Sequence, residues 1–302
     1  MDYKNFRFEA VVDFIEIQIH TVDRTRGDIV KLKTGVSYAT PVDKTSGNSA
    51  SIFKICLYNV KSFADLHDRV RCIELSVPVS SPTIITMIEV AFDAYNKLQL
   101  SPAAAAASLA EMAAHMAYHV ANPVSVNQRT FHDYKGSGRA MPISIEALMR
   151  ELADGRNVGF GNLKDDKYQH GYFKTTDCKV PIEDQRQHRA RFEIRLAGQC
   201  LPFANVEGWK DFKFESLAKY LSFRRQPDSP SKFREMMIDA YASKASHRRN
   251  TRRRSGGGTT AHIMPADADL NRIVRKRLQG LSLRWQTAEK GRENGTVKVT
   301  VS

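Results

Sequence analysis

Three short segments of this chain alternate apolar and polar side chains in the manner of strands with one buried face. They are residues 86–93, 167–174 and 191–196. Because successive side chains of a strand point to opposite faces, each segment predicts one apolar face and one polar face. Strands of this kind form antiparallel sheets that bury a core on one side only. This pattern constrains the fold more than any other feature of the chain.

The remaining segments predict strands and helices in irregular order. Such an order favours an α+β fold with a largely antiparallel central sheet flanked by helices. An alanine-rich stretch that begins at Pro102 predicts a helix, since proline is favoured at the first helical position. The other predicted strands are 8–20, 52–58, 71–77 and 157–161, and the predicted helices are 64–69, 102–120, 144–153, 214–223 and 231–245.

The composition changes after residue 245. An arginine run at 248–254 is followed by three glycines, which is typical of a flexible basic linker. Residues 247–302 hold 13 lysines and arginines and 4 acidic residues, so this segment accounts for +9 of the net charge of +13. Only a short helix is predicted there, at 268–279. We therefore expect a main domain at 1–245 and a basic, partly disordered tail at 246–302.

The charge of the chain predicts a polyanionic partner. A net charge of +13 and a pI of about 9.6 favour nucleic acid, although charge alone does not separate it from an acidic membrane surface. The N-terminus lacks an apolar signal segment, and no run reaches the ~18 apolar residues that would span a bilayer. The cysteines form no CxxC pair, which is typical of reduced thiols. These features predict a cytoplasmic protein without membrane attachment.

The polar faces of the three strands carry side chains suited to catalysis. Glu89 and Asp93 share a face in the first strand, and Glu193 lies between two arginines in the third. If the strands are neighbours in one sheet, these carboxylates converge with His170 and Tyr172 of the second strand. Clustered carboxylates repel one another unless a cation joins them, and oxygen ligands suit Mg²⁺ or Mn²⁺. Any one of these strands alone would also fit an ordinary solvated sheet face.

A metal next to a tyrosine indicates phosphoryl chemistry. The ion would polarise a phosphodiester, and Tyr172 would attack phosphorus and hold one DNA end covalently. A free tyrosine has a pKa of about 10, so it needs a base or a metal to lose its proton. His170 and Lys174 share the face of Tyr172, where they would assist catalysis or bind phosphate.

Taken together, the three motifs resemble those of the rolling-circle replication initiators of small plasmids and phages, which are related to conjugative relaxases. The resemblance extends over residues 8–223. The residues that carry it are Met87-Ile88-Glu89-Val90-Ala91-Phe92-Asp93, then Phe160-Gly161 with His170-Gly171-Tyr172-Phe173-Lys174, and finally Arg191-Phe192-Glu193-Ile194-Arg195-Leu196.

The resemblance implies a specific activity for residues 1–245. Tyr172 would nick one DNA strand at a replication origin, keep the 5′-phosphate and leave a 3′-hydroxyl as a primer. Glu89, Asp93 and Glu193 would hold the divalent metal. Partners implied in the same way are a host helicase and polymerase, and a second copy of the chain in a homodimer. No nucleotide-binding loop is present, in agreement with a transfer that needs no ATP.

The basic residues near these strands and in the tail are expected to contact DNA. They add affinity for phosphate that is independent of sequence and sensitive to salt. They are Lys167, Arg191 and Arg195 in the main domain, and Arg248, Arg249, Arg252, Arg253 and Arg254 in the tail.

The sequence departs from the family pattern at three positions. Met87 and His170 stand where the family has arginines, and Glu89 stands where it has an aspartate. These departures leave open a non-catalytic DNA-binding regulator on a related scaffold, whereas the retained Tyr172 and carboxylates favour the enzyme. A conjugative relaxase would be a variant of the same class of enzyme. Tyr168 is a candidate second nucleophile, because it shares the face of Tyr172.

Two histidines of the alanine-rich segment have the spacing of a metal-binding pair. His115 and His119 lie four residues apart, which places them on one face of the predicted helix at 102–120. The pair lacks an accompanying glutamate and an obvious third ligand. We therefore interpret this segment as an ordinary amphipathic helix.

Overall fold

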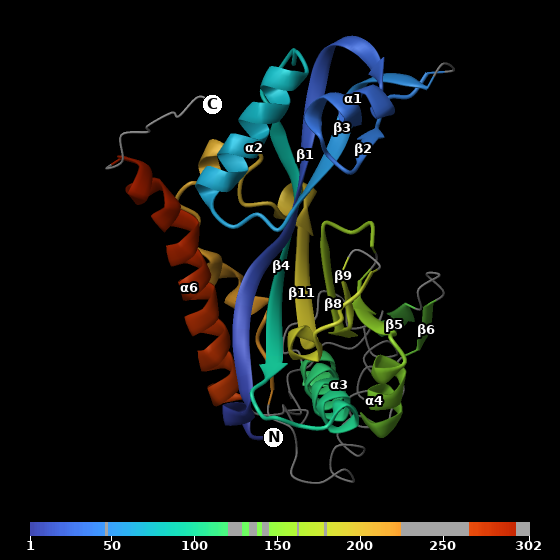
Figure 1. Cartoon of the computed structure of the whole chain (residues 1–302), viewed down its shortest axis with the longest axis vertical. Coiled ribbons are helices and arrows are strands. Elements are labelled where there is room, and N and C mark those ends of the chain that lie inside the picture. Colours follow the sequence, from blue (N-terminus) through green and yellow to red (C-terminus); the bar gives the residue numbers. More distant parts are fainter. Residues whose placement is uncertain are drawn as a thin grey trace, which may run out of the picture.

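A nine-stranded antiparallel sheet forms the centre of the molecule (Figure 1). The computed structural model describes residues 1–45, 48–119, 129–132, 138–140, 145–161, 163–177, 180–224 and 266–293. The strand order is β2-β3-β1-β4-β11-β8-β7-β5-β6. These strands are β1 (Phe6–Arg26), β2 (Ala39–Pro41), β3 (Ser49–Tyr58), β4 (Ile84–Asn96), β5 (Arg129–His132), β6 (Gly138–Ala140), β7 (Asn157–Phe160), β8 (Lys167–Lys174) and β11 (Arg189–Ala197). A separate two-stranded sheet pairs β9 (Thr176–Asp177) with β10 (Val180–Pro181).

Helices flank this sheet, so the predicted α+β class is confirmed. Two of them lie at one end of the long strand β1 and two at the other, while the last helix runs along its side (Figure 1). The helices are α1 (Gly27–Thr34), α2 (Phe63–Ser76), α3 (Pro102–His119), α4 (Ile145–Ala153) and α6 (Ala268–Glu293). Short 3₁₀ helices are η1 (Tyr3–Asn5), η2 (Gln185–Gln187), η3 (Gly198–Cys200), η4 (Glu207–Trp209) and η5 (Phe214–Lys219). None of the helices in the described part of the chain is long and apolar enough to cross a membrane.

The strand predicted at 71–77 is wrong, because residues 71–76 form the last part of helix α2 and Val77 is its C-cap. Its buried residues Phe63, Leu66, Val70 and Ile73 recur at helical spacing, and the helix places them against the core. The hydroxyl of Ser62 accepts a hydrogen bond from the backbone N–H of Asp65 (3.1 Å) and caps the helix. The helix expected at 64–69 was therefore too short.

Helix α3 packs closely on one face of the sheet, against β8 and β11. The fit depends on small residues, since Ala113, Ala114 and Ala117 are buried. A Cβ atom on Gly171 of β8 would lie 3.0 Å from the ring of Phe192 and 3.5 Å from Cβ of Ala117. Because side chains alternate along β8, the residues next to Gly171 point to the opposite face of the sheet.

Helix α6 is longer and better packed than the short helix predicted at 268–279. It extends to Glu293, and its buried side chains belong to the same core as the sheet. The indole N–H of Trp285 donates a hydrogen bond to the backbone oxygen of Trp209 (2.7 Å). The buried residues of the helix are Leu270, Val274, Leu278, Leu281 and Trp285. The proposed boundary at 245/246, the predicted helix at 231–245 and the arginine run at 248–254 lie outside the described residues.

Strand β1 contains a bulge that changes which residues face the core. Before the bulge Val12 pairs with Val90, and after it Phe14 pairs with Glu89, so Asp13 is the extra residue. The buried positions accordingly shift from even numbers, such as Val12, to odd numbers, such as Ile15. Both Asp13 and Phe14 therefore face the side of the sheet opposite the core that α3 covers.

Candidate active site

The strand order places the three predicted polar faces side by side. β11 lies between β4 and β8 and pairs antiparallel with both. The adjacency on which the predicted convergence depended is therefore present. Three rows of cross-strand neighbours run over the polar face: Glu89–Arg195–Tyr168, Ala91–Glu193–His170 and Asp93–Arg191–Tyr172.

Arg191 is a buried cation shared by three carboxylates. Its Nε and Nη2 atoms donate to the two oxygens of Asp93 at 2.6 and 2.7 Å. Its Nη1 atom donates to Oε1 of Glu193 (3.0 Å) and also to Asp13. Burial opposes the charged form, but the carboxylate of Asp93 and then that of Glu193 raise the pKa of Arg191 well above its ordinary value. Arg191 therefore remains charged and fully engaged within the protein.

Glu193 is the centre of the polar cluster. Its Oε2 atom lies 2.5 Å from Nε2 of His170, and its Oε1 atom accepts a hydrogen bond from the hydroxyl of Tyr172 (3.0 Å). Burial alone would raise the pKa of this carboxyl, but His170 and Arg191 outweigh it and hold the pKa below its ordinary range. Glu193 in turn raises the pKa of His170, against the effect of burial. Each of the two groups therefore stabilises the charged form of the other.

Glu89 behaves differently from Glu193 although the two carboxylates are close. Burial, followed by repulsion from Glu193, raises the pKa of Glu89 to about 7. Arg195 donates from Nε to Oε2 of Glu89 at 2.8 Å, but this ion pair does not offset the other two effects. Glu89 is thus a carboxyl that exchanges its proton near neutral pH, as expected where negative charges are crowded.

Tyr172 contacts the carboxylate cluster through its hydroxyl. Burial and then the charge of Glu193 raise its pKa well above the usual value of a phenol. Its ring stacks on that of His170, with 5.2 Å between ring centroids and 6° between planes, and Tyr168 stacks on the other side of His170 at 5.3 Å. The hydroxyl is therefore held in place and protonated, and it needs added positive charge nearby to ionise.

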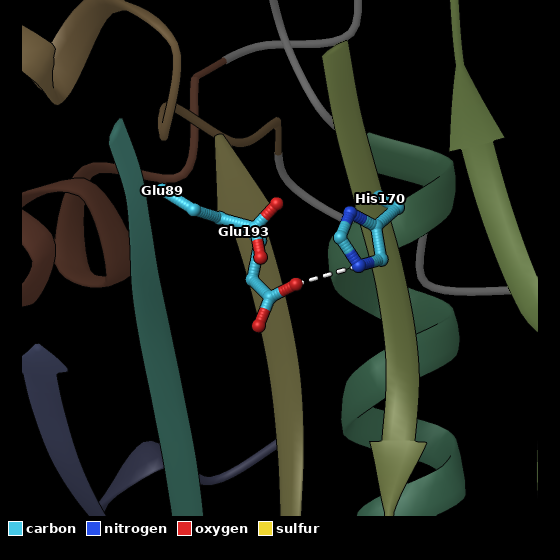
Figure 2. A group of neighbouring side chains, drawn as sticks. All are labelled: Glu89, His170 and Glu193. Atoms are coloured by element: carbon cyan, nitrogen blue, oxygen red, sulfur yellow. Dashed lines mark ion pairs between the residues drawn. The ribbon is translucent and has the colours of Figure 1, made fainter. Parts of the chain in front are cut away.

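Glu89, His170 and Glu193 form a possible site for a divalent cation. They point toward one another from β4, β8 and β11 (Figure 2), and each offers one ligand atom, all within 4.8 Å of one another. The Nδ1 atom of His170 is buried and has no hydrogen-bond partner in the described part of the chain. Carboxylates suit Mg²⁺ and Mn²⁺, whereas an imidazole favours a transition metal. The donor set therefore fits a divalent cation, and Mn²⁺ better than Mg²⁺.

The composition of this cluster differs from the three carboxylates expected from the sequence. Asp93 lies one row away and is occupied by Arg191, with Arg189 at 3.4 Å. His170, expected to assist catalysis, takes its place beside the two glutamates. The physical reason is the register, which sets an arginine directly opposite Asp93.

The structure separates the basic residues that were expected to contact DNA. Arg191 and Arg195 are engaged with buried carboxylates on the polar face. Lys174 lies on the same face, 2.9 Å from Asp177 and 3.8 Å from Asp13. Lys167 pairs with Leu196 and approaches the ring of Tyr220 (5.9 Å), on the core side of β8.

His115 takes part in a contact between elements that are distant in the sequence. Its Nε2 atom lies 3.0 Å from the hydroxyl of Tyr3 and 3.6 Å from Asp267, and Tyr3 also donates to Asp267. This cluster joins η1, α3 and the start of α6, which lies beside the N-terminus in Figure 1. His115 therefore helps to hold these elements together. The side chain of His119 lies outside the described part of the chain.

Asp13 is the acidic residue of the polar face that the sequence analysis missed. It contacts Arg191, and its carboxylate is about one-fifth exposed, more than those of Asp93 and Glu193. The signal was present as a break in alternation, since Phe8, Ala10 and Val12 are followed by Ile15 and Ile17.

Comparison with known proteins finds a similarity among solved structures. No family model matches the sequence, and no curated protein matches it. Among solved structures, the fold is similar to that of a rolling circle replication initiator protein from Geobacillus stearothermophilus, with 11% sequence identity and a TM-score of 0.37. The alignment covers 91% of this chain and 97% of that chain. At this identity and TM-score, the similarity supports no conclusion about function.

Proposed function

We propose that this chain is a metal-assisted DNA nicking-joining enzyme that initiates rolling-circle replication, with Tyr172 as its nucleophile. One observation carries the proposal: the Tyr172 hydroxyl donates a hydrogen bond to Glu193 at the edge of the Glu89–His170–Glu193 cluster. A buried tyrosine beside a group of acidic and imidazole ligands is what an activated phenolate requires. The three sequence motifs, in their order, resemble those of replication initiators, and this resemblance supports a replication origin as the target.

In the proposed reaction, the phenolic oxygen of Tyr172 forms a bond to phosphorus and the bond from phosphorus to the 3′ oxygen breaks. The products are a 5′-phosphotyrosine and a DNA 3′-hydroxyl, which takes a proton from water. The phenolic proton is already directed at Glu193, its nearest acceptor. Glu89, His170 and Glu193 would hold Mn²⁺ or Mg²⁺, which supplies positive charge to the phosphate and to the phenolate.

The remaining residues of the face orient these groups. Arg191 fixes Glu193, and the stacked rings of Tyr168 and Tyr172 fix His170. Lys174 pairs with Asp177, a carboxylate that is more than half exposed and that Arg189 also contacts. It is therefore better placed than Arg191 to turn to a DNA phosphate.

The test is a cleavage assay on single-stranded and supercoiled DNA from the native replicon, with Mn²⁺ and with chelator. Wild-type protein should nick in Mn²⁺ and form a covalent adduct, and Tyr172→Phe should form none. Glu193→Ala should nick roughly a hundredfold more slowly or worse, since proton transfer and metal binding are both affected. Tyr38→Phe, an exposed tyrosine remote from these strands in the sequence, is the matched control and should behave as wild type.

Other outcomes distinguish the alternatives. An adduct that survives Tyr172→Phe would move the nucleophile, and Tyr168 would be tested next. Tight DNA binding with no adduct in any metal would favour a non-catalytic regulator. A nick without dependence on metal would remove the role given to Glu89, His170 and Glu193.

A further inference from the structure

Asp13 lies on the polar face at the bulge in β1, in alternation with Glu9 and Val11 of the preceding part of the strand. Strand β1 neighbours β4, and without the extra residue the alternation would continue unbroken across this point. The backbone of the bulge is anchored, because the N–H of Asn59 donates to the carbonyl oxygen of Asp13 (3.1 Å). The bulge changes the phase of the strand after Asp13, so that Phe14 faces the same side as Asp13. Asp13 adds one negative charge to a face already crowded with carboxylates.

The carboxylate of Asp13 lies next to two cations, Lys174 and Arg191. Asp93 occupies Nε and Nη2 of the guanidinium, so Nη1 is left to Asp13 and Glu193 together. Asp13 and Glu193 therefore share one nitrogen atom, which has two N–H groups to donate. Loss of the Asp13 carboxylate would leave Nη1 to Glu193 alone.

A second cation is held in a similar manner. Nζ of Lys174 lies 3.8 Å from Oδ1 of Asp13, and the positive charge of Lys174 also acts on Glu193. Without Asp13, both Arg191 and Lys174 would direct more of their positive charge at Glu193. A divalent cation near Glu193 would then meet stronger competition and repulsion.

We propose that Asp13 is a positioning residue, which acts through Arg191 and Lys174 to keep Glu193 available to a divalent cation and to Tyr172. This inference rests on the function proposed above. Residues that orient a metal ligand from outside the ligand set commonly change metal affinity by about ten- to a hundredfold. Among the described residues, Asp13 forms its ion pairs with Arg191 and Lys174 and none with the three ligands, and its negative charge also acts at a distance on Glu89.

The experiment measures Mn²⁺ binding to the full chain by calorimetry, without DNA. Asp13→Asn and Asp13→Ala should each weaken binding about tenfold, and Asp13→Glu should restore part of it. The matched control is Glu9→Gln, on the same strand, which removes the same charge from a residue paired with Arg7. It should bind Mn²⁺ within about twofold of wild type. The nicking rate constant should fall in Asp13→Asn while the KM for DNA is unchanged.

The controls make the two proposals separable. Asparagine keeps the shape of aspartate, and a denaturation curve checks that Asp13→Asn is folded. If Asp13→Asn binds Mn²⁺ as tightly as wild type, or if Glu9→Gln weakens binding equally, the positioning role is overturned while the proposed function stands. If wild-type protein binds no Mn²⁺ and nicks no DNA, the proposed function fails, and this inference fails with it.

Discussion

At the scale of single residues, the polar face shows that a charged side chain can be structural even on a protein expected to bind DNA. Arg191 has the chemistry of a phosphate contact, yet its donors are turned to Asp93, Asp13 and Glu193. Breaking a buried ion pair by removing one partner is costly because the other charge remains buried. An arginine therefore stabilises the fold when it is buried among carboxylates, whereas on an open surface it is available to bind a phosphate.

Replacement of Arg191 by Met tests this structural role. Asp93 and Glu193 would lose their main buried counter-charge, so we expect the free energy of unfolding to fall by about 3–5 kcal/mol. Urea denaturation followed by circular dichroism measures the change. Unchanged stability, with a salt dependence of DNA binding reduced by about one phosphate contact, would instead identify Arg191 as a DNA ligand.

At the scale of elements, helix α6 begins at a residue that joins three distant parts of the chain. Asp267 accepts a hydrogen bond from the N–H of Leu270 (2.9 Å) and so caps the helix, and it also contacts Tyr3 and His115. Burial opposes ionisation of Asp267, but the bonds from His115 and Tyr3 lower its pKa to about 2.

This lowered pKa makes a contribution to stability that depends on pH. A carboxyl whose pKa falls on folding stabilises the protein above its unfolded pKa of ~3.9, and the stabilisation is lost as pH falls toward 2. Asp267→Asn keeps a good helix cap but removes the charge, so it should cost about 1–2 kcal/mol at pH 7 and progressively less below pH 4. Unfolding curves at pH 7, 4 and 3 measure the difference.

Asp269→Asn is the control for Asp267→Asn. It removes the same charge from the first turn of the same helix, but Asp269 is exposed and pairs only with exposed Arg272 among the described residues. A change within about 0.5 kcal/mol is expected at every pH. An equal effect of the two variants would mean that the helix dipole, and not the buried contact, is responsible.

At the scale of the whole molecule, the described part of the C-terminal segment belongs to the core of the main domain. Trp285 is fully buried, its ring packs edge-on against Phe214 at 5.4 Å, and Arg284 donates to the backbone of Ala10 in β1 (2.7 Å). The position of α6 in the sequence, after a glycine-ended arginine run, suggests a tail. Its packing instead makes it part of the layer that covers the sheet.

Replacement of Trp285 by Ala tests whether α6 and the sheet unfold together. A cavity of this size should destabilise the whole protein by about 3–5 kcal/mol, with one shifted transition in calorimetry. The control is Leu283→Ala, on the same helix but 60% exposed, which should change stability by less than about 0.5 kcal/mol. A main transition unaffected by Trp285→Ala would show that residues 246–302 are a separate tail.

The sequence by itself determined the sheet class and the identity of the polar-face residues, because the period of two is a local property that each strand carries. It identified Tyr172, Glu89, Glu193 and His170 as sharing the polar face. Residues 71–77 were misassigned because a short apolar run suits a strand or a helix, and only packing against the core decides between them.

Only the tertiary structure decided how these residues pair. Register between strands distant in the sequence set Arg191 opposite Asp93, and so placed His170 beside Glu193. The contact of Asp13 with Arg191 likewise depends on the pairing of β1 with β4, which the sequence does not show. Partners, pKa shifts and burial depend on which charges meet across strands, and a one-residue change of register would exchange them all.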